Sequence, residues 1–254
     1  MNFEAIFKRF INDWQKFLMM GLGPLIVNFA VGAIGTVIML VLVGPSIFNL
    51  IRMDAMGMAP SSGSMFGLIG SFVGAFVVMM LVAVVAFGLS TAGLMGSVAG
   101  YRRGEEVSIG SFWGHATRHY GKVILIGLIL GVIMMVSMIL MIIPVLGWLA
   151  MAVWGPTAAV VLGLYPAHLA VNAGMSVGDS VGAGFKVLTA HFKEALIGGL
   201  IMLGFGIALS MIGMIPLVGW IVGMLFGQPL ITYFFVERFE LEVRPKLPNL
   251  PPVV

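Results

Sequence analysis

The sequence predicts an all-α, polytopic integral membrane protein with six transmembrane helices arranged as three helical hairpins. Apolar residues make up 60% of the 254 residues, and charged residues make up 9%, whereas soluble domains carry about 25% charged residues. No charged residue occurs in 17–51, 55–101 or 123–178. The bilayer is therefore the expected main solvent of this chain.

The first 17 residues are predicted to form an amphipathic helix in the plane of the membrane interface. Apolar side chains recur there at the i, i+3, i+4 spacing of one helical face, namely Phe3, Ile6, Phe7, Phe10, Ile11, Trp14 and Phe17. Charged residues occupy the other face. We therefore expect Phe7, Phe10 and Trp14 to lie at the boundary with the acyl chains.

The first transmembrane hairpin is expected over 18–99, because about 20 apolar residues span the hydrocarbon core. Its helices are placed at 18–43 and 66–99, with a long outer loop over 44–65 between them. The first apolar stretch exceeds the roughly 7–15 residues of a secretory signal, so it is expected to remain as a span.

Two further hairpin units are expected over 100–171 and 172–238. Within them, 123–178 has room for two spans, and two more are placed at 195–215 and 217–236. Shorter interfacial helices are expected before these hairpins, at 108–120 and 179–192, so that each hairpin is preceded by one. The last residues, 239–254, are rich in proline and are expected to form a cytoplasmic tail.

The motif Ile-Pro-x-x-Gly-Trp occurs at 143–148 and again 72 residues later at 215–220. Proline ends a helix, glycine permits a tight turn and tryptophan favours the membrane interface. Six residues are therefore predicted to close the hairpins: Pro144, Gly147, Trp148, Pro216, Gly219 and Trp220. The fixed spacing predicts that the second and third units are an internal repeat.

Basic residues are distributed unevenly between the two predicted sides of the membrane. All of the 13 lysines and arginines except Arg52 fall on one side. The positive-inside rule therefore predicts that both termini are cytoplasmic. The net charge of +3 is too small to indicate a nucleic-acid partner.

Small residues form ladders with a spacing of four, which lets helix backbones approach closely in lipid. The predicted helix-packing positions are Gly88, Ala92, Gly96, Gly155, Ala159, Gly163, Gly219, Gly223 and Gly227. Packing within one chain is the favoured interpretation, and a self-association face is the alternative.

No catalytic, cofactor or metal site is expected. No Asp, Glu, Lys or Arg lies inside a predicted span, although membrane enzymes and proton relays usually use such residues. The four histidines are expected at the cytoplasmic edge of the membrane. Cysteine is absent, so only a methionine-rich segment of the outer loop offers soft ligands, at Met53, Met56 and Met58. A flexible loop is favoured over metal binding there.

Several short motifs suggest a family. Gly-Glu-Glu-Val-Ser at 104–108, Phe112-Trp113, the 143–148 motif, Pro166 and Val-Gly-Asp-Ser at 177–180 occur in this order. Over about 85–238 the chain resembles the polytopic membrane domain of some bacterial glycerophosphoryl diester phosphodiesterases and its stand-alone relatives. The resemblance implies a multi-pass protein of the bacterial cytoplasmic membrane. The phosphodiesterase catalytic domain has no counterpart here, so no activity is implied.

The expected function is that of a non-enzymatic scaffold, accessory subunit or lipid-organising component of a membrane complex. Membrane lipids and either a protein partner or further copies of the chain are the expected partners. The alternative is a permease or channel for an apolar, lipidic or small neutral substrate. Proline residues in the even-numbered spans favour that alternative, whereas the lack of charge inside the spans disfavours it.

Overall fold

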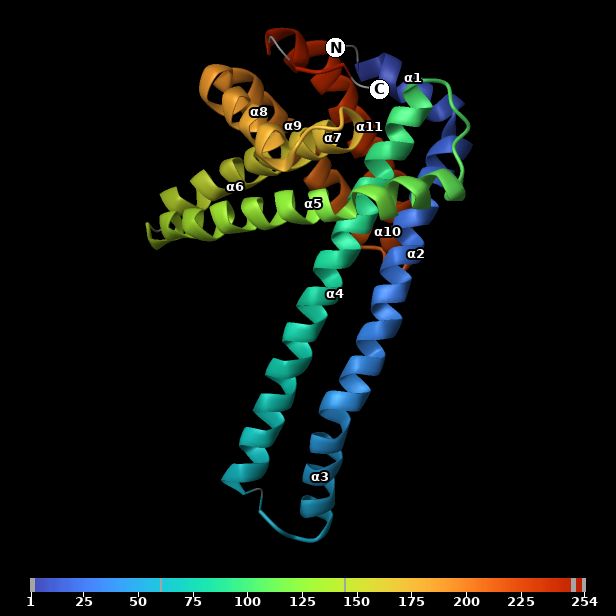
Figure 1. The fold of residues 1–254 in the computed structure, drawn as a ribbon. Helices are drawn as coiled ribbons and strands as arrows, with labels where there is room; N and C mark the ends of the chain where they lie inside the picture. The colour runs from blue at the N-terminus through green and yellow to red at the C-terminus, as the bar shows by residue number, and fades with distance from the viewer. Residues whose placement is uncertain (1–2, 60, 144, 248–249, 253–254) are drawn as a thin grey trace. The chain divides into compact units, whose positions relative to one another are not determined.

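The computed structural model describes residues 3–59, 61–143, 145–247 and 250–252, and it contains helices and no strands within them. In chain order (Figure 1) the elements are α1 (Phe3–Asn12), α2 (Trp14–Ile38), η1 (Met39–Val43), α3 (Gly44–Ala55), α4 (Ser62–Arg102), α5 (Ile109–Ser137), η2 (Met138–Ile142), α6 (Leu146–Ala158), η3 (Ala159–Leu164), α7 (Tyr165–Asn172), α8 (Val177–Ala190), α9 (Phe192–Gly213), α10 (Val218–Val222), η4 (Gly223–Gly227), α11 (Gln228–Arg238), η5 (Phe239–Val243) and η6 (Arg244–Lys246).

Six helical stretches among the described residues are long and apolar enough to cross a membrane. They are Trp14–Ala55, Ser62–Arg102, Ile109–Ile142, Leu146–Asn172, Phe192–Gly213 and Val218–Lys246. This result confirms the predicted all-α, polytopic membrane class.

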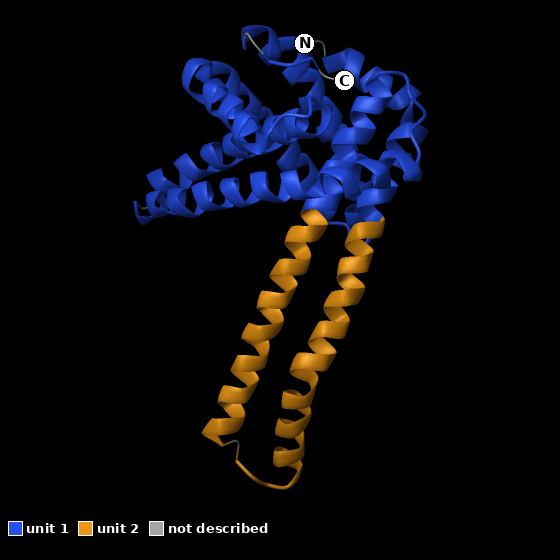
Figure 2. Ribbon diagram, viewed as in Figure 1, with its two compact units in different colours: residues 1–25, 88–254 blue, residues 26–87 orange. Residues whose placement is uncertain are grey.

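The chain divides into two compact units (Figure 2). Unit 1 contains residues 1–25 and 88–254, and unit 2 contains residues 26–87. Unit 2 is an antiparallel helical hairpin whose side chains are largely exposed. One hydrogen bond of 2.8 Å joins the hydroxyls of Ser46 and Ser71 across this hairpin.

The core of unit 1 forms where small residues let helices approach closely. Phe112 is fully buried, and its ring lies against Gly23 of α2 and Gly93 of α4. Phe112 lies in the first turn of α5, which begins with a capping box. In it, the side chains of Ser108 and Ser111 each accept a hydrogen bond from the other residue's backbone N–H. On the other side of the unit, α6 packs against α9. A Cβ on Gly199 would lie 2.8 Å from Thr157 Cα there, so only glycine fits.

Four prolines each follow a π-helical segment by two residues: Pro45 after η1, Pro166 after η3, Pro229 after η4 and Pro245 after η5. In each case the residue before the proline donates its N–H to the carbonyl five residues earlier. A proline ring clashes with the carbonyl of an ordinary helical turn. One extra residue per turn relieves that clash and keeps the backbone paired, as a spanning helix requires. Pro24 and Pro156, by contrast, lie inside ordinary α-helix.

The two hairpin turns have the same local geometry. Val145 and Leu217, which are 72 residues apart, are the described non-glycine residues with positive φ, at 64° and 61°. A Cβ on Gly147 would lie 2.8 Å from the carbonyl carbon of Leu140, and one on Gly219 would lie 2.7 Å from that of Ile212. Pro216 lies in the second turn, whereas Pro144 is outside the described residues.

Trp148 and Trp220, which flank these turns, are 65% and 39% exposed. Both indole rings are thus accessible to the surroundings next to a chain reversal. This placement is compatible with the predicted interfacial anchors.

Three expected boundaries need correction. The outer loop over 44–65 is wrong, because α3 occupies Gly44–Ala55 and α4 begins at Ser62. The π-helical turn before Pro45 lets the helix continue, and Gly57 with a φ of 68° follows its end. The segment 108–120 is not a separate interfacial helix, since it forms the start of α5. The expected tail over 239–254 is helical as far as Lys246, and it buries Phe239 and Val243.

Candidate functional site: a polar network in unit 1

The C-terminal helix, defined here as α11, η5 and η6 (228–246), carries the largest group of charged side chains in the chain. Its charged side chains contact residues of α4, α7 and α9, which are distant in the sequence. We call this set of contacts the polar network. It includes a pair of charges at 2.7 Å between Arg102 Nε of α4 and Glu237 Oε2.

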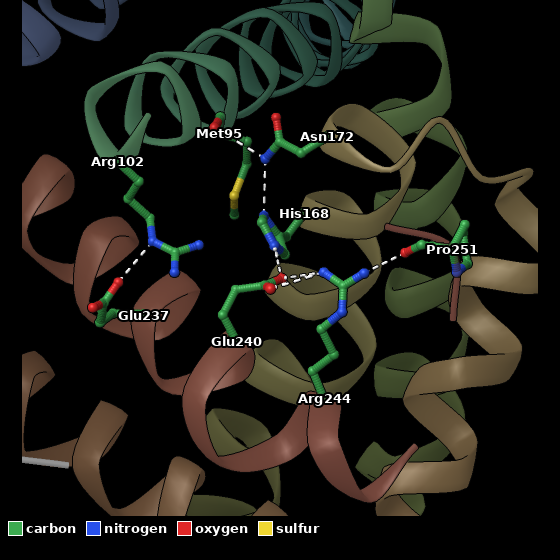
Figure 3. A network of polar contacts seen from close by, with 8 residues as sticks. All are labelled: Met95, Arg102, His168, Asn172, Glu237, Glu240, Arg244 and Pro251. Atoms are coloured by element: carbon green, nitrogen blue, oxygen red, sulfur yellow. Dashed lines mark hydrogen bonds and ion pairs between the residues drawn. The ribbon is translucent and has the colours of Figure 1, made fainter. Parts of the chain in front are cut away.

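His168 of α7 lies at the centre of the network (Figure 3) and is 1% exposed. Its Nε2 lies 2.8 Å from Glu240 Oε1, and its Nδ1 lies 2.8 Å from Asn172 Nδ2. The same amide nitrogen donates to the Met95 carbonyl at 3.1 Å. An amide nitrogen can only donate, so Nδ1 must accept. The hydrogen therefore resides on Nε2, which donates it to Glu240.

Glu240 also accepts two hydrogen bonds from the Nη1 atom of Arg244, at 3.0 and 2.8 Å. Arg244 in turn donates to the Pro251 carbonyl (Figure 3). One carboxylate, one guanidinium and one neutral imidazole thus satisfy one another. Charge pairing of this kind is what permits such groups to lie away from water.

Arg238 forms the second centre of the network and is also 1% exposed. It donates to Tyr165 Oη at 3.0 Å and to the backbone carbonyl of Glu194 at 2.9 Å. The carboxylates of Glu194 and Glu242 each lie 3.3 Å from its guanidinium. Gly198 leaves room for this group, because a Cβ there would lie 2.6 Å from Arg238 Nη1.

Polar contacts hold α1 and the residue after it, Asp13, to the rest of unit 1. Arg9 Nη1 donates to Tyr233 Oη at 2.9 Å, and this hydrogen bond raises the pKa of Arg9. Tyr101 Oη donates to Asp13 Oδ2 at 2.5 Å, and this hydrogen bond lowers the pKa of Asp13. The rings of Phe17, Tyr101 and Tyr233 meet edge to face, with centroids 5.5–5.6 Å apart.

The predicted interfacial residues fall into two groups. Phe7 and Trp14 are 45% and 48% exposed. Phe10 packs instead against the rings of Phe17 and Phe226, with centroids 5.0 and 6.1 Å away. One part of the apolar stripe therefore contacts protein, and the other part is open to the surroundings.

The glycine ladder of α4 faces α5. A Cβ on Gly88 would meet Ile124, one on Gly96 would meet His115, and Ala92 between them is fully buried. These three positions therefore pack within the chain.

The other ladders are less uniform. Gly155 and Gly163 face Met134 and Leu130 of α5, and Gly227 faces Leu209 of α9. Gly219 lies at a hairpin turn, where its backbone meets Ile212 and Gly213 of α9. A Cβ on Gly223, by contrast, would have no neighbouring atom within 4 Å outside its own helix among the described residues.

Sequence reasoning missed the polar network because it assigned His168 to the membrane edge and Glu240 to a tail. A signal was present in the spacing. His168 and Glu240 are 72 residues apart, which is the offset of the two Ile-Pro-x-x-Gly-Trp motifs. Asn172 and Arg244, their hydrogen-bonded neighbours four residues later, are also 72 residues apart.

The described residues of unit 1 form several grooves, of which three have similar volumes. One, of about 580 Å³, lies beside α8 and the C-terminal residues. Another, of about 560 Å³, lies between α6 and α9, and Gly155, Ala159 and Gly206 are among its lining residues. The third, also of about 560 Å³, is bordered by α1, α9 and the C-terminal helix. Neither His168 nor Glu240 lines any of these three grooves.

A metal centre built on histidine or carboxylate ligands is not found among the residues that the structure describes. The methionines of the expected outer loop lie at the end of α3 and just after it. Met56 and Met58 are 52% and 47% exposed, and Met53 is partly exposed. Thioether coordination at this tip stays an untested alternative.

The fold defines a multi-pass α-helical membrane protein. Its C-terminal helix carries charged side chains that pair with those of other helices in the same chain. Comparison with protein-family models found no match, and neither did comparisons with curated proteins or with solved structures. The resemblance to the membrane domain of glycerophosphoryl diester phosphodiesterases therefore remains a sequence-based expectation.

Proposed function

We propose that the chain is a non-enzymatic integral membrane protein that serves as a scaffold, accessory subunit or lipid-organising component. The observation that carries this proposal is the internal neutralisation of the polar network. Its two buried centres, His168 and Arg238, bind carboxylates of the same chain. The His168–Glu240 pair lines none of the three grooves, and Arg238, which borders the third, is 1% exposed and is held by Glu194 and Glu242. Ionisable groups that act on substrates are usually held in a cleft with perturbed protonation.

Co-purification tests the proposed role. We expect the tagged full-length chain, extracted in mild detergent, to retain either a defined protein partner or further copies of itself. Mass spectrometry of the eluate would identify the partner, and native mass spectrometry would give the stoichiometry. A chain recovered only as a monomer, with neither a protein partner nor bound lipid above the level in an untagged control, would contradict the proposal.

We also propose the cytoplasmic membrane of a bacterium as the location, with both termini in the cytoplasm. The distribution of basic residues and the resemblance support this placement. The chain has no native cysteine, so single cysteines can be introduced without background. A cysteine near Ser61 should react with an impermeant label from outside the cell, and one near Glu105 should not. Equal labelling would reject this orientation.

The proposed internal repeat is supported by the shared turn geometry at Val145 and Leu217 and by the matched glycines at 147 and 219. Under this proposal His168 of the second unit meets its counterpart Glu240, which lies in η5, the helical continuation of the third unit.

A permease for an apolar substrate is the second candidate. The groove between α6 and α9 favours it, because its lining is mainly apolar and it adjoins the π-helical segment η3. Gly206→Trp would fill that groove. A substrate that raises the thermal stability of the native chain, but not that of this variant, would support transport over the scaffold role.

A further inference from the structure

The groove between α1, α9 and the C-terminal helix has a charged end and an apolar end. Its volume is about 560 Å³. Lys193 and Lys246 lie at the charged end, and Ile197, Ile201 and Leu241 contribute apolar surface. Such a lining matches a molecule that has a polar head and a hydrocarbon chain.

The charged end carries a net positive charge. The lining contains three basic side chains, Lys193, Arg238 and Lys246, and two acidic ones, Glu194 and Glu242. Both carboxylates are held by cations of the chain, since Glu194 pairs with Lys246 at 2.6 Å and each lies 3.3 Å from Arg238. Lys193 is exposed and forms no ion pair within the described part of the chain. It remains available to an external anion.

The apolar end continues along one face of α9. Lys193, Ile197 and Ile201 follow one another at intervals of four residues, so they lie on the same side of the helix. Eight residues of helix extend about 12 Å. Phe3 and Leu241 border the same groove and are 47% and 57% exposed. An acyl chain would cover this apolar surface.

We propose that this groove binds one anionic glycerophospholipid. Its phosphate contacts the Lys193 ammonium, and one acyl chain lies along Ile197 and Ile201. The spanning stretch Phe192–Gly213 begins one residue before Lys193, which places this lysine where a span leaves the hydrocarbon core. A free phosphate would satisfy only the charged end, whereas a phospholipid satisfies both. This site rests on the lipid-organising role among those proposed above and names the lipid class and the residues that bind it, without need of a protein partner.

Native mass spectrometry would test this assignment. The delipidated full-length protein is incubated with phosphatidylglycerol or phosphatidylcholine in mild detergent, and the bound lipid is counted. We expect one tightly bound phosphatidylglycerol and weaker binding of phosphatidylcholine. Lys193→Gln should weaken phosphatidylglycerol binding about fivefold, the usual effect of one basic residue near an anionic headgroup. Arg118→Gln removes an exposed charge outside the groove and should leave binding unchanged.

Two further variants separate charge from shape. Lys193→Arg keeps the charge and should retain binding, whereas Ile197→Trp fills the apolar end and should lose binding with every charge intact. Thermal stability without lipid shows whether each variant is folded. The assignment is overturned if Lys193→Gln and Arg118→Gln bind equally, if phosphatidylcholine binds as tightly as phosphatidylglycerol, or if inorganic phosphate stabilises the protein as strongly as the lipid. A protein partner found without bound lipid would preserve the proposed function and refute this site.

Discussion

Unit 1 and unit 2 are both built from long apolar helices, yet they are held together in different ways. Unit 2 buries four described hydrophobic side chains, Val27, Val43, Ala75 and Ala86. Its ionisable residues, Arg52 and Asp54, are both exposed. Unit 1 buries His168, Asn172 and Arg238 and gives each a partner on another helix.

The difference shows what specifies tertiary structure in a bilayer. Lipid is as apolar as leucine, so the burial of apolar side chains provides little drive for helix association. Hydrogen bonds between helices and close approach at small residues then decide which helices meet. Unit 1 has several hydrogen bonds between helices and several glycines at which two helices approach closely. In unit 2, the Ser46–Ser71 hydrogen bond and the contact of Gly35 with Met79 join the two helices.

Arg238→Met should have the largest effect. It removes the donor that Glu194, Glu242 and Tyr165 share, and each lost hydrogen bond of this charged group costs about 1.5–3 kcal/mol. The matched change in unit 2, Arg52→Met, should alter the free energy of unfolding by less than about 0.5 kcal/mol. Unfolding in mild detergent measures the free energy of unfolding of both variants. Equal losses of stability would show that the two units do not differ in this respect.

Gly147→Val and Gly219→Val should each cost about 1–3 kcal/mol, because the added atoms collide with backbone that cannot move aside. The two losses should be similar, since the turns have the same geometry. Gly223→Val provides a control in the same region, where a Cβ would meet no neighbouring helix among the described residues. Clearly unequal losses at the two turns would contradict their equivalence.

The attachment of α1 should depend on pH through Asp13. The hydrogen bond from Tyr101 lowers the folded-state pKa of Asp13 below its ordinary value of 3.8. The stabilisation is therefore present above that value and is lost as the pH falls through the lower folded-state pKa. At neutral pH we expect the native chain to melt at a higher temperature than Asp13→Asn. The difference should shrink in acid, and a difference that stays constant down to low pH would exclude Asp13 as its source.

Ser46→Ala should have a smaller effect than these changes in unit 1. It removes the hydrogen bond to Ser71, and such bonds between helices in membranes contribute about 0.6 kcal/mol. Replacing Met53, Met56 and Met58 with leucine should change the unfolding free energy even less, because Met56 and Met58 are exposed. A loss as large as that of Arg238→Met would show that unit 2 depends on contacts of another kind.

The sequence alone determined the class of the protein, the six spans and the position of the two short turns. The physical reason is local. Every backbone group in hydrocarbon must pair within its own helix, so a charge-free apolar stretch of sufficient length predicts a span. A proline before a glycine and a tryptophan likewise predicts the end of a span at the interface.

Only the tertiary structure decided the ends of the helices and the identity of the buried polar residues. A loop was expected from residue 44, but the π-helical turn before Pro45 keeps the backbone paired and the helix continues. Glu240 was assigned to the C-terminal tail and Arg238 to the residue just before it. Their partners could not be predicted, because His168 lies 72 residues from Glu240 and Glu194 lies 44 residues from Arg238. A charged side chain can be buried when a group of opposite charge lies beside it. Whether such a group is there depends on how helices that are distant in the sequence pack together.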